Sequence, residues 1–446
     1  MRLSSVPLLF AVMLATFQPG SAVQAQGHDA GLFQRALMIG SNVRNASGPG
    51  QYSYQADYSV PTRFETIRLL LVNTALTPQR LEGIVAASSQ SMKDMTSPDG
   101  GTWSVVTIAG SRTPVLAAAT SPSLPSYTLS DEIRLRSLPR SDSKAGSLVF
   151  TRVVTAHDAY SVAYLAGPAP NGSVVPGRFL PVPHGETAEW GFARGDFVNS
   201  DRTAMRLSNT TRDMALFYVA GLVYSSHTPG LTLMAVGDSL TQGYATASDY
   251  AGFGRIAAAM LTASGQPTSY VDASWAGQTT GEFLARAYAL LDLGIRPDYL
   301  TIPIDSPNDY DEKSGQLSGR PGAQTVMMQH ISAFSLAEYA RSLGVVPIMI
   351  PPLPLGTKGQ WDAPERFDPA NYIPKSAGTE NIWFNAPALI CSCKPSMSTI
   401  PEIPVVDLAH DQAHYSAALQ YRLGTALADL IMHHPGGGTS RPSGSP

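Results

Sequence analysis

Two rhythms of apolar and polar residues divide the chain. Between residues 32 and 226, short runs rich in leucine, β-branched and aromatic residues are separated by clusters of Gly, Pro, Ser, Asn and Asp. Such spacing, without helical periodicity, predicts short antiparallel strands and an all-β, sandwich-like domain over residues 32–226. The clearest strands are expected at residues 67–72, 103–108, 147–154 and 214–219.

A different rhythm follows the turn residues Thr-Pro-Gly at 228–230. Apolar strands now alternate with helical patterns, and this alternation predicts an α/β domain over residues 230–434, with a parallel sheet and helices on both faces. Strands are expected at residues 231–236, 270–273, 299–304, 345–350 and 404–408, and helices at 252–264, 281–293, 325–344 and 416–433.

Two segments do not fit this alternation. Residues 351–401 are rich in proline and have no clear periodicity. Loops of this length in compact domains usually serve a function, so we interpret the segment as an insertion loop beside the active site. Residues 435–446 are mostly Gly, Ser and Pro and are expected to be a disordered tail.

The first residues have the pattern of an export signal. Arg2 precedes an apolar run over residues 6–17, and small residues follow around Ala22 and Ala25. This order predicts a secretory signal peptide over residues 1–25, with cleavage after Ala25 or Ala22. The run is about a dozen residues long, whereas a membrane span needs about 20. We therefore expect a secreted or periplasmic protein with no membrane span after signal removal.

Composition removes several classes of partner. The formal net charge is −4, from 30 basic and 34 acidic residues. Because no basic surplus exists to neutralise phosphates, a nucleic-acid partner is not expected. The two cysteines, Cys391 and Cys393, exclude a disulfide-stapled scaffold. A bridge between them would be strained, so free thiols and a labile bridge both stay open. The histidines show no metal-ligand spacing, and neither a metal nor another cofactor is expected.

A serine directly follows the first strand of the α/β region. Gly-Asp-Ser-Leu occupies residues 237–240, so Ser239 is expected at the carboxyl edge of the sheet, where open α/β folds bind ligands. A serine hydroxyl needs a base to attack an ester. His414 is the candidate base, and Asp411, three residues earlier, can accept the imidazole N–H and fix its tautomer.

These segments resemble, in order, the four blocks of the SGNH (GDSL) hydrolase family. The second block contributes Gly277, the third contributes Asn308 with Ser306 where the family usually has Gly, and the fourth contains Asp411 and His414. The resemblance covers residues 231 to about 433. It implies a flavodoxin-like three-layer α/β/α domain. It also implies an oxyanion hole formed by the backbone N–H groups of Ser239 and Gly277 and the Asn308 amide. More faintly, residues 63–74 and 129–131 resemble the β-rich module that precedes the catalytic domain in some secreted members.

Some assignments stay open at this stage. Asp407 and His410 repeat the spacing of Asp411 and His414, although the position of His414 between a predicted strand and helix favours the second pair. The substrate cleft has four aromatic candidates, of which the last two belong to the insertion: Trp275, Tyr310, Trp361 and Trp383. Four aromatic residues of the amino-terminal half could stack on sugars or belong to the core: Tyr52, Tyr54, Tyr58 and Trp103.

Two classes of function fit this sequence. The first is a secreted serine esterase that hydrolyses short acyl esters, acetyl above all, through an acyl-serine intermediate. Its substrate would be an acylated small molecule or polysaccharide, and an acyltransferase that uses the same residues is a variant of this interpretation. The second class is a non-catalytic carbohydrate-binding protein on a retained hydrolase scaffold.

Overall fold

The computed structural model describes most of both halves of the chain. The described residues are 32–38, 42–49, 51–91, 98–121, 123–141, 146–156, 160–165, 188–194, 215–216, 218–244, 246, 252–311, 316–355, 381–390, 403–409 and 411–434. The predicted signal peptide and tail lie outside them, as do Trp361, His410, Cys391 and Cys393. Within the described part, no helix is both long and apolar enough to span a bilayer.

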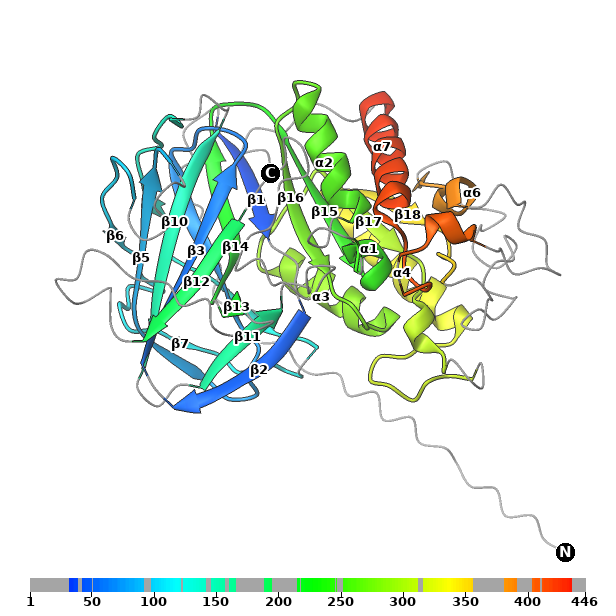
Figure 1. Ribbon diagram of the computed structural model, residues 1–446, viewed down its shortest axis with the longest axis horizontal. Helices are drawn as coiled ribbons and strands as arrows, with labels where there is room; N and C mark the ends of the chain where they lie inside the picture. Colours follow the sequence, from blue (N-terminus) through cyan, green and yellow to red (C-terminus); the bar gives the residue numbers. More distant parts are fainter. Residues whose placement is uncertain are drawn as a thin grey trace, which may run out of the picture.

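Five parallel strands form the sheet of the carboxyl-terminal half (Figure 1). They are β15 (Leu231–Gly237), β16 (Thr268–Ser274), β17 (Tyr299–Pro303), β18 (Val346–Ile350) and β19 (Ile382–Trp383). Their order is β19-β18-β17-β15-β16. The strand order therefore reverses beside β15, and doubly wound sheets bind their ligands at such a switch point.

Helices cover both faces of these strands. They are α1 (Ser239–Gln242), α2 (Phe253–Ala263), α3 (Thr280–Asp292), α4 (Val326–Ser342), α6 (Ala386–Ile390) and α7 (Ala417–His433). In β15, Leu233 packs in one core cluster with α2 and α7, whereas Met234 packs in the other with α3 and α4. Successive side chains of a strand point to opposite faces, so β15 is buried on both sides. The predicted three-layer α/β/α arrangement is confirmed for these elements.

The fifth strand of the parallel sheet is not the one that the sequence predicts. Residues 404–408 were expected to form it, but Val405–Asp407 is a 3-10 turn, η3, closed by a bond from Asp407 N–H to the Pro404 carbonyl. The edge position beside β18 belongs to β19, from the predicted insertion. Val406 is 81% exposed, whereas Leu408 is 7% exposed and packs in a core cluster, so the apolar pattern of this run reports partial burial beside a turn and not a strand inside the sheet.

The strands of the amino-terminal half extend the same sheet. Beyond β16 it continues through β1 (Phe33–Met38), β14 (Val219–Ser226), β4 (Thr66–Asn73) and β8 (Ser126–Leu129), and β9 (Ile133–Arg134) also pairs with β4. β1 joins the two parts, because it pairs antiparallel with β14 and meets β16 in parallel at Met38 and Val271. The boundary that the sequence places near residue 230 is therefore a turn between β14 and β15. The strands before and after this turn belong to one hydrogen-bonded sheet, joined through β1.

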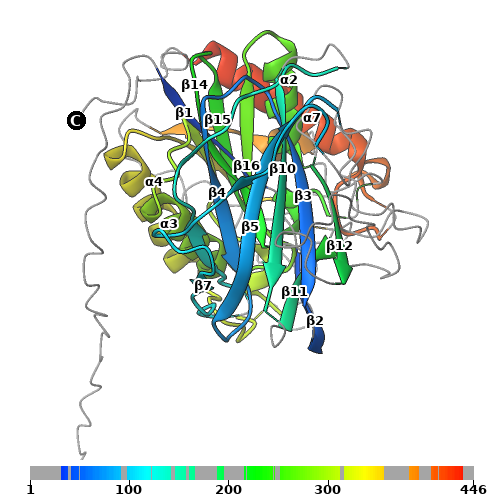
Figure 2. The same cartoon turned by 90° about the vertical axis from the view of Figure 1, so that its left-hand side faces the viewer.

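A second sheet lies against this extension, as Figure 2 shows. Its strands are β12 (Ala188–Arg194), β3 (Tyr52–Val60), β10 (Ser147–Thr155), β5 (Gln79–Ser89) and β6 (Ser104–Val105), with β7 (Val115–Leu116) paired to β5. The strands β13 (Ala215–Leu216), β11 (Tyr160–Leu165) and β2 (Asn42–Pro49) form a third sheet. The described elements of the amino-terminal half are all strands, and one of their sheets is shared with the α/β half.

Two of the four aromatic residues that the sequence assigns either to sugar stacking or to the core belong to the core between the sheets. Tyr54 and Tyr58 are each 1% exposed. The Tyr54 ring packs edge-on against Tyr218, and the Tyr58 hydroxyl donates to the Val219 carbonyl at 2.6 Å. These contacts join β3 to the start of β14, so both rings have a packing role.

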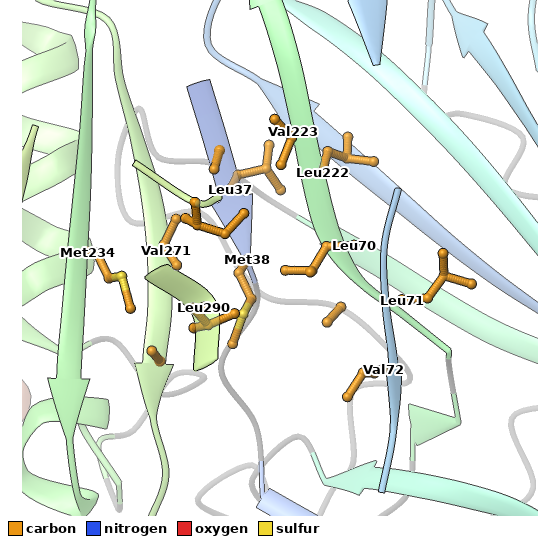
Figure 3. Close-up of a cluster of buried hydrophobic side chains, with 14 of the residues drawn as sticks. Leu37, Met38, Leu70, Leu71, Val72, Leu222, Val223, Met234, Val271 and Leu290 are labelled. Atoms are coloured by element: carbon orange, nitrogen blue, oxygen red, sulfur yellow. The ribbon is translucent and has the colours of Figure 1, made fainter. Parts of the chain in front are cut away.

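The core is continuous between the two halves. Figure 3 shows Leu37 and Met38 of β1 between Leu70 of β4 on one side and Val271 and Leu290 on the other. These side chains belong to one cluster of buried residues that includes strands of both sheets together with α3 and α4. The amino-terminal half thus covers the edge of the parallel sheet and shares its apolar core, rather than being tethered to it by a linker.

Candidate active site

Ser239 is held at the sharp turn between β15 and α1. Asp238 is the N-cap of α1, and its Oδ1 accepts the Leu240 N–H at 2.9 Å. Gly237 has φ +147°, and an added Cβ would lie 2.3 Å from Thr241 Oγ1, so this turn requires glycine. The result is a nucleophile candidate fixed by backbone geometry at the carboxyl end of β15, with 6% of its surface exposed.

His414 and Asp411 complete a chain of hydrogen bonds to this serine. His414 Nε2 lies 2.9 Å from Ser239 Oγ, and His414 Nδ1 lies 2.6 Å from Asp411 Oδ2. Burial raises the pKa of Asp411, but hydrogen bonds from the His414 side chain and from the backbone N–H groups of His414 and Ala413 outweigh it, and the net pKa lies well below the usual range. An ionised Asp411 can only accept, so Nδ1 carries the proton and Nε2 is free to accept from Ser239.

The competing Asp-x-x-His motif has a different role for its carboxylate. Asp407 is 6% exposed and forms two 3.0 Å bonds to Arg422 of α7, one to each guanidinium NH group. Its backbone carbonyl accepts the Ser416 N–H at 2.8 Å, and Ala409 N–H donates to the His414 carbonyl at 2.7 Å. Asp407 therefore anchors the loop that carries His414 to α7. The Asp407–His410 alternative left open by the sequence is not favoured, although His410 itself lies outside the described residues.

The predicted oxyanion loop is fastened to the nucleophile turn. Ala276 N–H donates to Gln242 Oε1 of α1 at 2.8 Å, and Trp275 N–H donates to the Gly237 carbonyl at 3.1 Å. Gly277 follows with φ +79°, which favours glycine. Within the described part of the chain, the N–H of Gly277 has no protein acceptor. Its role as an oxyanion donor stays a prediction.

Ser306 connects the third block to the first two. Its side chain is completely buried, and its Oγ lies 2.5 Å from Asp238 Oδ2 and 2.9 Å from the Gln278 carbonyl, two acceptors for its single proton. The same Oγ accepts from the Asn308 backbone N–H at 3.2 Å and lies 3.1 Å from Asn308 Nδ2. Ser306 adopts φ −132°, which any residue can adopt. A serine at this position, where the resemblance leads us to expect glycine, thus adds a hydroxyl to the loop without straining it.

The Asn308 amide lies next to the nucleophile turn. Its Nδ2 is 3.0 Å from the Gln278 carbonyl and 3.4 Å from Asp238 Oδ2. One N–H can bind Gln278 while the second stays close to the residue that precedes Ser239. Burial raises the pKa of Asp238, against the hydrogen bonds from Ser306 and the Leu240 N–H and the charge of His414, which lower it.

The described cleft candidates make packing contacts. Trp275 is 3% exposed, and the Arg286 guanidinium lies 3.5 Å from its ring centroid. Tyr310 is 8% exposed, with its hydroxyl 3.5 Å from Gln329 Oε1 of α4. Trp383 packs edge-on against Phe334 of α4. None of these contacts involves the Ser239–His414 pair, so a cleft role for the three residues stays a prediction, and Trp361 lies outside the described residues.

Two residues near the site were not singled out from the sequence. The Tyr244 ring lies edge-on to the His414 imidazole, with centroids 4.9 Å apart. Gln420 of α7 is 1% exposed; its Nε2 donates to the Leu240 carbonyl and its Oε1 accepts the Phe253 N–H, both at 2.9 Å. A signal for Gln420 existed, since it is a polar residue at helical spacing with Leu423 and Leu427, both of which are buried.

Comparisons with known proteins find similarity only to solved structures. No protein-family model and no curated protein matches the chain. One similar structure is the psychrotrophic esterase EstA from Pseudoalteromonas sp., with 17% identity over 45% of this chain and 96% of that chain and a TM-score of 0.33. A second is the lipase/acylhydrolase from Enterococcus faecalis, with 19% identity over 45% of this chain and 95% of that chain and a TM-score of 0.34. A third is a catalytic mutant of Axe2, an acetylxylan esterase from Geobacillus stearothermophilus, with 18% identity over 48% of this chain and 98% of that chain and a TM-score of 0.36. Similarity at these values does not assign an activity to this chain.

Together these groups have the components of nucleophilic acyl chemistry. A serine hydroxyl, an imidazole and a carboxylate are linked by hydrogen bonds, and two further segments bring N–H donors to the same turn. Among the described residues, no group of three or more His, Cys, Asp or Glu side chains could hold a metal ion.

Proposed function

We propose that this chain is a serine ester hydrolase. The observation that carries the proposal is the pair of hydrogen bonds at 2.9 Å and 2.6 Å that link Ser239 through His414 to Asp411. The hydroxyl of a free serine is a weak nucleophile, and a base within hydrogen-bond reach, itself oriented by a third group, is what activates it.

In the proposed reaction, Ser239 Oγ bonds to the ester carbonyl carbon while its proton passes to His414 Nε2. The negative charge on the carbonyl oxygen is met by the N–H groups of Ser239, Gly277 and Asn308. Collapse of this intermediate breaks the ester bond, and the leaving alkoxide takes the proton from His414. Water then attacks the acyl-serine by the same steps, which releases the acid and restores the serine.

We extend the proposal to short acyl esters of exported substrates, with acetylated carbohydrate as the first candidate. The predicted signal peptide supports export, and the resemblance to SGNH hydrolases supports ester hydrolysis. Hydrolysis of acetylated xylose or cellobiose, followed by release of acetate, tests the carbohydrate part separately from the ester chemistry.

The test of the ester chemistry is turnover of 4-nitrophenyl acetate by the purified chain and by Ser239→Ala. We expect Ser239→Ala to lose activity by a factor of about 10³ or more and to keep its thermal unfolding midpoint, because Ala occupies the same turn without strain. A matched control is Ser335→Ala, an exposed serine of α4 that bonds only to its own helix. Turnover by Ser239→Ala at the level of the control would show that another group is the nucleophile.

A further inference from the structure

A positively charged side chain lies directly beside the oxyanion loop. Arg320 belongs to the segment between η1 (Pro307–Asp309) and α4, and its guanidinium donates to the Gly277 carbonyl at 2.5 Å. An ideal Cβ built on Gly277 would lie 3.6 Å from Arg320 Nη2. The side chain is otherwise exposed. Within the described part of the chain, this guanidinium has no carboxylate partner.

The segment that presents Arg320 is fixed to both predicted oxyanion segments. On the Asn308 side, Ser318 N–H donates to the Asp309 carbonyl at 2.7 Å and Ser318 Oγ donates to the Asn308 carbonyl at 3.1 Å. On the Gly277 side, Thr279 Oγ1 donates to the Pro321 carbonyl at 2.8 Å. Arg320 is therefore placed by backbone and buried contacts on either side of it, and its position relative to Gly277 does not depend on its own single hydrogen bond.

The other charges of the site do not neutralise this cation. Asp411 is ionised but bound to His414, and Asp238 is buried, with its oxygens accepting from the Ser306 hydroxyl and the Leu240 N–H. Asp309 is also buried, and its oxygens accept from Thr280, Gln324 and Gln329. A guanidinium has five N–H donors in a planar fork that matches a carboxylate. With one donor on Gly277, the remaining face is open to a ligand.

We propose that Arg320 selects esters that carry a carboxylate, so that the preferred substrate is an acidic ester such as an acylated uronic acid or a half-ester of a dicarboxylic acid. This inference rests on the proposed ester hydrolase function. An anionic group bound near Gly277 would gain a charge-assisted hydrogen bond, and the exposed cation would raise the rate of encounter at low ionic strength.

The experiment compares kcat/KM for matched acidic and neutral esters at pH 7 and low salt. The charge is placed on the alcohol side with 4-acetoxybenzoate against its methyl ester, and on the acyl side with mono-4-nitrophenyl adipate against 4-nitrophenyl hexanoate. In each pair, the acidic-to-neutral ratio is measured for the parent chain, Arg320→Gln, Arg320→Lys and Arg320→Met. Forming the ratio within each variant cancels any general loss of activity, and comparing the ratio between variants cancels the intrinsic reactivity of the esters.

We expect the acidic-to-neutral ratio to fall about 5- to 10-fold in Arg320→Gln and Arg320→Met, and to fall less in Arg320→Lys. At about 0.5 M salt, the ratio of the parent chain should decrease towards that of Arg320→Gln, because salt screens the charge. A fall in either pair supports the proposal and identifies the side that carries the charge. The control is Arg134→Gln, an exposed arginine of β9. In the sheet, Arg134 pairs with Thr66 at the start of β4, and Thr66 pairs with Ser225 near the end of β14. These residues lie at the edge of the sheet opposite the one that carries Ser239, so this arginine is remote from the candidate site.

The experiment distinguishes failure of the Arg320 proposal from failure of the ester hydrolase proposal on which it rests. If the parent chain hydrolyses the neutral esters but every Arg320 variant keeps the parent ratio in both pairs, Arg320 has only a structural role on the Gly277 loop and the proposal is overturned. If the parent chain hydrolyses none of the four esters, the ester hydrolase function itself is wrong.

Discussion

The Ser306 hydroxyl lies 2.5 Å from Asp238 Oδ2, and so the loop that follows β17 touches the residue that precedes the candidate nucleophile. The Asp238 carboxylate holds α1 through the Leu240 N–H, and Ser306 also contacts Asn308. One buried hydroxyl thus couples the position of the nucleophile turn to that of a predicted oxyanion donor.

Removal of this hydroxyl should impair chemistry more than binding. We expect Ser306→Ala to lower kcat for 4-nitrophenyl acetate about 10- to 100-fold with little change in KM, because a lost hydrogen bond to the buried Asp238 carboxyl group and a misplaced oxyanion donor both act on the transition state. Ser306→Gly should behave in the same way, since both variants lack Oγ. An unchanged kcat with a lower unfolding midpoint would assign Ser306 a purely structural role, and Ser335→Ala serves again as the exposed control.

Asp411 should act through the tautomer of His414. Asp411→Asn replaces an acceptor facing Nδ1 by a group that can donate, which favours the wrong tautomer. We expect kcat to fall about 10²–10⁴-fold at nearly constant KM. His410→Ala should keep the parent kcat. A His410 variant that loses activity beside an active Asp411→Asn variant would reverse the choice between the two Asp-x-x-His motifs.

Asp309 should make the stability of the chain depend on pH below neutrality. Burial raises its pKa to about 6 from 3.8, against the hydrogen bonds from Thr280, Gln329 and Gln324, which lower it. The folded state therefore binds a proton that the unfolded state releases between pH 4 and 6. The stabilisation from this group is fully present below about pH 4 and is lost as pH rises through 6.

The measurement is urea unfolding of the parent chain and Asp309→Asn from pH 4 to 8. The free energy of unfolding of the parent, minus that of the variant, should fall by on the order of 2–3 kcal/mol between pH 4 and 7. A difference that is constant over this range, or that rises with pH, would contradict the raised pKa.

The α/β half should not fold on its own. In a fragment of residues 230–434, the edge of β16 would lose β1, and Val271 and Leu290 would lose the apolar neighbours Leu37 and Met38. Exposed strand edges and large apolar patches promote aggregation. We expect the fragment to be insoluble or to lack a cooperative thermal transition, whereas residues 26–446 unfold cooperatively. A soluble, active fragment would show that the amino-terminal half is an independent accessory module.

Several parts of this molecule are readable from local sequence patterns. The helices α2, α3, α4 and α7 lie within a few residues of their expected ranges, because each buries an apolar stripe or face that the sequence displays. The position of Ser239 after a strand and before a helix also follows from local pattern, as does the helix start after His414. The prediction of a strand at residues 404–408 is wrong, because an apolar run of five residues does not by itself show whether its side chains are buried, and here Val406 faces solvent.

Local patterns in the sequence were enough to predict the α/β alternation, the first four strands of the parallel sheet and the residue types of a serine-based site. The three-dimensional structure adds that the two halves share a sheet through β1, that Asp407 binds Arg422 while Asp411 binds His414, and that Ser306 and Arg320 lie against the predicted oxyanion segments. Periodicity reports only which side of one helix or strand faces the core or the solvent. Most of these contacts join residues that are far apart in the sequence, and the two Asp-x-x-His motifs have the same spacing, so neither can be resolved from a local pattern. The packing of the whole chain brings the partners together.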